Sequence, residues 1–232
     1  MGRIVGIGGG EPETAYKIHQ YIAGMAGKAE PRVLFIGTAS HDNEEYSAYI
    51  HSDFEGFGCT VEDLRLSGGE VTAEEIDGLL AQADILYVGG GDTAYMMEVW
   101  RKYGLDEKLK EIYREDRAIL SGLSAGAMCW FRCGHSDSAV FEGNEEGGFG
   151  WVENLLGIYP YAFCPHYDLR VESFDRMLGA LDVPGLAVEE NAAFVDDNGT
   201  ISYIASTETA TAYLCRYEDG RLVKEAQPMK RL

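Results

Sequence analysis

A serine with a glycine two residues away on each side stands out in the segment Gly122–Gly126, which has the sequence Gly-Leu-Ser-Ala-Gly. The apolar run Ala118–Leu120 before it is typical of a buried strand, and the small and apolar residues Ala127–Phe131 after it favour a helix. Strand, sharp turn and helix in this order form a nucleophile elbow, which lifts the serine hydroxyl above the sheet edge. The helix start would offer N–H groups to a developing oxyanion. The pattern predicts Ser124 as a nucleophile; the alternative is a glycine-rich turn with a capping serine.

A serine hydroxyl needs a base to become nucleophilic near neutral pH, and histidine is the natural one. His19 and His51 fall in amphipathic helical stretches, where we expect them at the surface. His166 follows the short apolar run Tyr161–Cys164, and Pro165 restricts the approach to it, so His166 is the predicted base. The remaining histidines are His41, at a strand end, and His135, in a polar segment.

The first half of the chain alternates short apolar runs with amphipathic stretches, which predicts β-α-β units and a mostly parallel sheet covered on both faces. The predicted strands are Ile4–Gly8, Arg32–Gly37, Thr60–Leu66, Ile85–Val88 and Ala118–Gly122. The predicted helices are Glu13–Ala26, Asn43–Phe57, Thr72–Gln82, Thr93–Tyr103 and Asp106–Glu115.

Two tight-turn signals mark the last third of the chain, Asn198-Gly199 and Asp219-Gly220, each between apolar runs. They predict short antiparallel strands appended to the parallel sheet. No repeat or linker interrupts the sequence, so we expect one domain over residues 1–232. The Gly-, Ser- and acid-rich segment Gly134–Gly150 is expected to be a long functional loop.

The composition of the chain narrows the classes of function and partner that we expect. The 232 residues carry a net charge of −20 and are 46% hydrophobic, which suffices for one sizeable core and disfavours nucleic acid as a partner. No run of about 18 apolar residues could span a bilayer, and no secretory leader is recognised. The five scattered cysteines are typical of reduced thiols. We expect a cytoplasmic protein without cofactor, metal or membrane partner, with a homodimer left open.

Three segments together resemble the peptidase E (aspartyl dipeptidase) family of serine peptidases, which includes the cyanophycinases. They are Gly122–Ala127 around the serine, Tyr87–Thr93 with the sequence Tyr-Val-Gly-Gly-Gly-Asp-Thr, and Cys164–Asp168 around the histidine. Their order is that of the family. The resemblance implies a three-layer α/β sandwich that is flavodoxin-like and similar to the class I glutamine amidotransferase fold.

The resemblance also implies the remaining site residues. A backbone N–H of Gly90 or Gly91 would join that of Ala125 as the oxyanion hole. The acid that orients His166 would be Asp137 by similarity to peptidase E, or Glu142 by similarity to the cyanophycinases. Asp168 and Glu189 are weaker candidates for the same role.

The implied activity is hydrolysis of short peptides with an N-terminal aspartate, through an acyl-enzyme on Ser124 with His166 as base. Arg170, four residues after His166, could grip the substrate carboxylate. One alternative is a cyanophycinase-like hydrolase of β-aspartyl or other amide substrates, for which Glu145, Glu146 and Glu153 could hold an arginine. The other is a non-catalytic binding or stress protein on the same fold.

Overall fold

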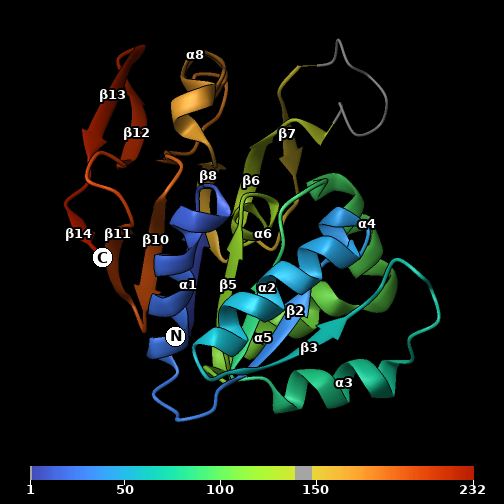
Figure 1. Cartoon of the computed structure of the whole chain (residues 1–232). Coiled ribbons are helices and arrows are strands. Elements are labelled where there is room, and N and C mark those ends of the chain that lie inside the picture. Colours follow the sequence, from blue (N-terminus) through green and yellow to red (C-terminus); the bar gives the residue numbers. More distant parts are fainter. Residues whose placement is uncertain (1, 139–147) are drawn as a thin grey trace.

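The computed structural model describes residues 2–138 and 148–232, and in this part of the chain helices flank two mixed β-sheets (Figure 1). The first sheet has the strand order β14-β11-β10-β1-β5-β4-β2-β3. Strands β1, β5, β4, β2 and β3 run parallel, as predicted. The α/β class with a mostly parallel central part is therefore confirmed. The strands of this sheet are β1 (Arg3–Ile7), β2 (Arg32–Ile36), β3 (Thr60–Leu64), β4 (Ile85–Val88), β5 (Ile119–Leu123), β10 (Ala192–Asp197), β11 (Thr200–Ala205) and β14 (Met229–Arg231).

Helices cover both faces of this sheet because successive strand residues point to opposite sides. Val5 and Tyr87 point to the face on which α1 and α2 pack. Ile4 and Leu86 point to the other face, where the buried side chains of α3, α4 and α5 meet them. The five predicted helices are confirmed, with bounds α1 (Pro12–Met25), α2 (Glu44–Gly56), α3 (Ala73–Gln82), α4 (Thr93–Tyr103) and α5 (Leu105–Glu115).

Side-chain caps set where two of these helices begin. Thr72 accepts a hydrogen bond from the N–H of Glu75, and the Glu75 carboxylate accepts one from the N–H of Thr72, which forms a capping box at α3. Asp92 accepts hydrogen bonds from the N–H groups of Ala94 and Tyr95 at the start of α4. The second cap holds α4 directly after the glycine turn that ends β4.

The second sheet has the order β13-β12-β9-β8-β6-β7 and was not expected as a separate sheet. The Asn198-Gly199 hairpin joins β10 and β11 at the edge of the first sheet, as predicted. The Asp219-Gly220 hairpin joins β12 and β13 in the second sheet instead, because β12 pairs with β9. The strands of this sheet are β6 (Phe131–Ser136), β7 (Gly150–Glu153), β8 (Tyr159–Cys164), β9 (Gly185–Val188), β12 (Ala212–Glu218) and β13 (Arg221–Ala226).

The second sheet lies at one end of the molecule, at the top in Figure 1, together with α8 (Tyr167–Leu178). One of its faces carries Phe131 and Leu186 into the large buried cluster that includes Ile4 of the first sheet. The opposite face packs against α8 through Phe174. Along the described residues, no helix has the length and apolar character needed to cross a bilayer.

The segment after Ser124 differs from the prediction. The helix there, α6, has only four residues (Ala125–Met128), and Phe131 already begins β6. Short runs of small and apolar residues suit a buried helix and a buried strand equally, so periodicity could not separate them. Gly134 and Ser136, which we assigned to a long loop, belong to β6.

Two histidines are also placed differently. His19 is fully buried, and both of its ring nitrogens have a polar partner, since Asp53 Oδ2 and Tyr87 Oη each lie 2.7 Å from one of them. His135 is likewise buried, on β6. The surface position expected for His19 is therefore wrong.

Candidate active site

Ser124 occupies a strained turn between β5 and α6, with φ 54° and ψ −109°. A Cβ atom at Gly122 would lie 2.6 Å from the carbonyl oxygen of Val88, and one at Gly126 only 2.1 Å from it. Neither position tolerates a side chain, because backbone atoms cannot move away as side-chain ends can. The two glycines let the turn press against β4 and present the serine at its apex.

His166 lies in hydrogen-bond contact with the serine. It joins β8 to α8 in a left-handed conformation with φ 50°. Its N–H donates to the carbonyl oxygen of Gly8 at 2.9 Å, and its Nε2 lies 3.0 Å from Ser124 Oγ. The structure thus brings the predicted nucleophile and base together, although 42 residues separate them.

The carboxylate beside His166 belongs to Glu190, in the connection between β9 and β10. Glu190 Oε1 lies 3.0 Å from His166 Nδ1, the ring nitrogen opposite the serine. Sequence reasoning missed Glu190, although it considered the adjacent Glu189. The available signal was its place directly after a buried strand, which puts it at the same rim as the serine.

The glycine run Gly8–Gly10 packs against the ring of His166. A Cβ atom at Gly9 would lie 2.3 Å from Nδ1 and Cε1 of the His166 ring. The N–H of Asn191 donates to the carbonyl oxygen of Gly9 at 2.8 Å, so the run also holds the loop that carries Glu190. The run therefore has a packing role at the Ser–His pair.

Asp168 ties the histidine and glutamate segments together. Its Oδ1 accepts a hydrogen bond from the N–H of Glu190 at 3.0 Å. Asp168 lies in the first turn of α8, two residues after His166. This sequence candidate for the triad acid therefore contacts the backbone of Glu190.

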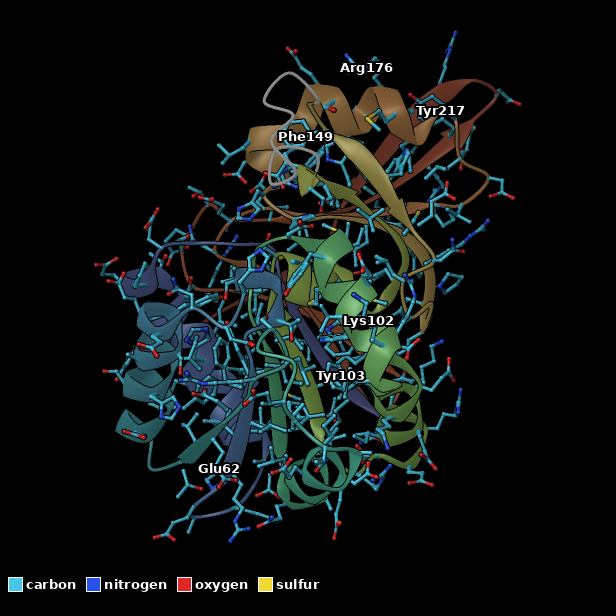
Figure 2. All side chains as sticks on the ribbon, turned by 90° about the vertical axis from the view of Figure 1, so that its right-hand side faces the viewer. Glu62, Lys102, Tyr103, Phe149, Arg176 and Tyr217 are labelled. Carbon is cyan, nitrogen blue, oxygen red and sulfur yellow. The ribbon has the colours of Figure 1, made fainter. Side chains whose placement is uncertain are left out.

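Asp137 lies beside Arg170 and not beside His166. Arg170 donates to the carbonyl oxygen of His135 at 2.9 Å and to Asp137 Oδ2 at 3.3 Å. Its guanidinium group also lies 4.9 Å from the ring centre of Phe149, which Figure 2 shows near α8. Asp137 therefore neutralises a buried arginine. Glu142, the other expected acid, lies outside the described residues, as do Glu145 and Glu146.

The glycine turn after β4 lies against the serine. A Cβ atom at Gly90 would be 3.5 Å from Ser124 Cβ. The N–H of Gly90 donates to Tyr46 Oη at 3.1 Å. Within the described residues, no hydrogen bond occupies the N–H of Gly91 or of Ala125. Of the three expected oxyanion donors, these two therefore have no acceptor in the described part of the chain.

No cysteine competes with Ser124 for the nucleophile role. All five cysteines are buried free thiols. Burial raises the pKa of Cys129, the thiol next to the elbow, well above its ordinary value, so this group stays a neutral thiol.

Burial, with the charge of Arg170, lowers the pKa of His135 to about 4. His135 is therefore a neutral core residue at neutral pH.

An α/β fold in which a histidine contacts a serine through one ring nitrogen and a carboxylate through the other, at the strand ends, has the arrangement of a hydrolase. The protein belongs to peptidase family S51, whose profile matches residues 4–204. Family membership places it among the peptidases.

The protein is similar to several known relatives. It is 29% identical to "Uncharacterized peptidase YgaJ" of Bacillus subtilis (strain 168), with both chains covered completely. It is 24% identical to a cyanophycinase of Synechococcus elongatus, over 86% of this chain and 64% of that protein. A "Probable alpha-aspartyl dipeptidase" of Drosophila melanogaster is 24% identical over 58% of this chain and 52% of that protein.

A solved structure supports the fold. The crystal structure of a "Putative Peptidase E Protein" from Listeria monocytogenes EGD-e superposes with a TM-score of 0.69 at 16% identity. The match covers 89% of this chain and all of that chain. The expected resemblance to the peptidase E family is confirmed by the match to family S51 and the similar relatives, and this structure supports the fold.

Proposed function

We propose that this protein is a serine peptidase that cleaves short peptides after an N-terminal aspartate, with Ser124, His166 and Glu190 as its triad. The observation that carries the proposal is the continuous contact from Ser124 Oγ to His166 Nε2 and from His166 Nδ1 to Glu190, at 3.0 Å each. Glu190 replaces Asp137 and Glu142 as the proposed acid because its carboxylate lies at the histidine.

The reaction follows from this geometry. His166 Nε2 takes the hydroxyl proton as Ser124 Oγ attacks the peptide carbonyl carbon, and Glu190 stabilises the imidazolium and holds the tautomer. The imidazolium then gives its proton to the leaving amine, and an acyl-enzyme remains on Ser124. Water, deprotonated by His166, hydrolyses the ester and restores the serine.

Two backbone N–H groups would stabilise the negative charge that develops on the substrate's carbonyl oxygen. The N–H of Ala125 lies at the start of α6, directly after the serine, and the N–H of Gly91 lies in the turn that packs on it. Donors held in place before the reaction contribute most to such steps, because they need no reorganisation as charge develops.

The aspartyl preference rests on the relatives, and the contacts of Arg170 do not add to it. Asp137 and the His135 carbonyl already occupy both terminal amino groups of Arg170, and only 7% of this residue is exposed. An acidic substrate side chain would have to displace Asp137. This contact therefore disfavours Arg170 as the carboxylate site, and the cyanophycinase similarity supports β-aspartyl amides as a second substrate class.

A panel of aminoacyl p-nitroanilides (Asp, Glu, Leu and Arg), with β-aspartyl-arginine added, tests the proposal. We expect the wild type to cleave one aspartyl substrate and Ser124→Ala to lose at least about 10³-fold in kcat while staying folded. Ser52→Ala, an exposed position on α2, is the control and should retain full activity. Wild-type rates in Ser124→Ala would refute the mechanism. No cleavage of any substrate would favour a non-catalytic role.

A further inference from the structure

Most backbone N–H groups in and after the turn Gly89–Gly91 donate a hydrogen bond. The N–H of Gly89 donates to the carbonyl oxygen of Ile36 at 3.1 Å, and that of Asp92 to the carbonyl oxygen of Ala39 at 2.8 Å. The N–H of Gly90 donates to a side chain, Tyr46 Oη, at 3.1 Å. Among these four consecutive amides, only that of Gly91 has no partner within the described residues. The turn is therefore held at three points, and the N–H of Gly91 has no acceptor among residues 2–138 and 148–232.

Little space separates this turn from its neighbours. Gly91 has φ 135°, and a Cβ atom there would lie 2.2 Å from the carbonyl oxygen of Ala39. At Gly89 a Cβ atom would lie 3.0 Å from Cε1 of Tyr46. The Tyr46 ring thus packs on the turn and also bonds to it, and Phe35 supports the ring at a centroid distance of 5.5 Å.

We propose that Tyr46 is a positioning residue for the oxyanion hole. Its hydroxyl takes the N–H of Gly90, which fixes the Gly89–Gly90 peptide plane on one side of the Gly90–Gly91 peptide. The hydrogen bond of Asp92 to Ala39 fixes the other side. The N–H of Gly91 is thereby directed toward the substrate oxygen, and Gly90 is excluded as a donor. This inference rests on the serine-peptidase function proposed above.

A second polar contact holds the helix that carries Tyr46. Asp53 lies two turns further along α2, on the same face as Tyr46. Its carboxylate lies 2.7 Å from His19 Nδ1, and His19 Nε2 lies 2.7 Å from Tyr87 Oη on β4. Helix α2 is thus tied to β4 near Tyr87 and again at Gly90. His19 therefore helps to fix the position of Tyr46 relative to the turn Gly89–Gly91.

The matched pair Tyr46→Phe and Tyr49→Phe tests this proposal. Both remove one hydroxyl from α2, but Tyr49 Oη lies near the carbonyl oxygen of Pro12 and makes no bond to the turn. Because a small displacement of a catalytic donor costs up to about 100-fold in rate, we expect Tyr46→Phe to lower kcat by about 10- to 100-fold. KM should change by less than about 3-fold. Tyr49→Phe should leave both within about 2-fold.

A second readout separates this proposal from the proposed function. The rate at which a fluorophosphonate labels Ser124 depends on the same oxyanion donors but needs no peptide substrate. We expect labelling to slow about 10-fold or more in Tyr46→Phe and to stay unchanged in Tyr49→Phe. A wild type that is labelled but cleaves no peptide would contradict the peptidase function and leave this test intact. Equal labelling rates in wild type and Tyr46→Phe, or equal losses in both variants, would overturn the positioning role.

Discussion

Three side chains far apart in sequence meet at the candidate site. Ser124 and His166 are separated by 42 residues, and His166 and Glu190 by 24. Each follows the end of a buried strand, β5, β8 or β9, so the strand ends bring them to one rim. Gly9 and Asp168 then fix the ring and the loop around it.

The acid assignment predicts different results for two conservative changes. Glu190→Gln should lower kcat by about 10² to 10⁴-fold with little change in KM, because an amide neither stabilises the imidazolium nor holds the correct tautomer. Asp137→Asn should leave kcat within about 5-fold, because Asp137 contacts Arg170 and not His166. Steady-state kinetics of both variants on the cleaved substrate decide whether Glu190 or Asp137 is the acid. A larger kcat loss in Asp137→Asn than in Glu190→Gln would contradict the assignment of Glu190 as the acid.

At the scale of elements, the elbow depends on contact between β5, α6 and β4. Gly126 lies against the carbonyl oxygen of Val88, so the turn and β4 are in backbone contact. The same β4 leads into the Gly89–Gly91 turn. The strand therefore supports both the proposed nucleophile and the proposed oxyanion donor.

Two glycine-to-alanine changes should have opposite effects on stability. Gly126→Ala would place Cβ 2.1 Å from the Val88 oxygen, so we expect a loss of about 3 kcal/mol or more, with activity lost. Gly24→Ala, in α1 with no atom within 4 Å, should raise the free energy of unfolding by about 0.5 to 1 kcal/mol. Urea titrations measure both. A Gly126→Ala variant as stable as the wild type would show that the contact is not restrictive.

At the scale of the whole molecule, the second sheet and α8 occupy the end opposite to β3. In Figure 2, Arg176 and Tyr217 lie at that end, and Glu62 of β3 lies at the other. Tyr217 Oη donates to the carbonyl oxygen of Asp175, which ties β12 to α8. His135 is buried inside this part, near Trp151 and Phe174.

This buried histidine predicts a stability that depends on pH. Its pKa is lowered to about 4 in the folded protein, from an ordinary value of 6.5, so between these values the unfolded chain binds the proton and the folded chain does not. The free energy of unfolding should therefore fall as the pH drops from 6.5 to 4, by up to about 3 kcal/mol from this residue.

Urea titrations between pH 7.5 and 4.5 of wild type and His135→Gln measure this contribution as the difference in slope. His51→Gln, a partly exposed position on α2, is the control. A wild type with the same pH slope as His135→Gln would show that His135 does not contribute.

Much of the first sheet could be predicted, because period and turn signals are local properties of the chain. The strands and helices up to α5, the turn at Ser124 and the position of the proposed base, His166, all follow strongly patterned segments. Alternation of residues on β1 and β4 also specifies which side chains face each helical layer.

The second sheet, the buried histidines and the acid could not be obtained in this way. Whether β12 pairs with β9 or with the first sheet depends on long-range packing, which leaves no periodic signal. His19 has the local context of a surface residue, and only Asp53 and Tyr87 make its burial favourable. Many carboxylates were available, and only the tertiary structure points to Glu190 as the proposed acid, because a triad acid is defined by its contact with the histidine ring and not by its neighbours in sequence.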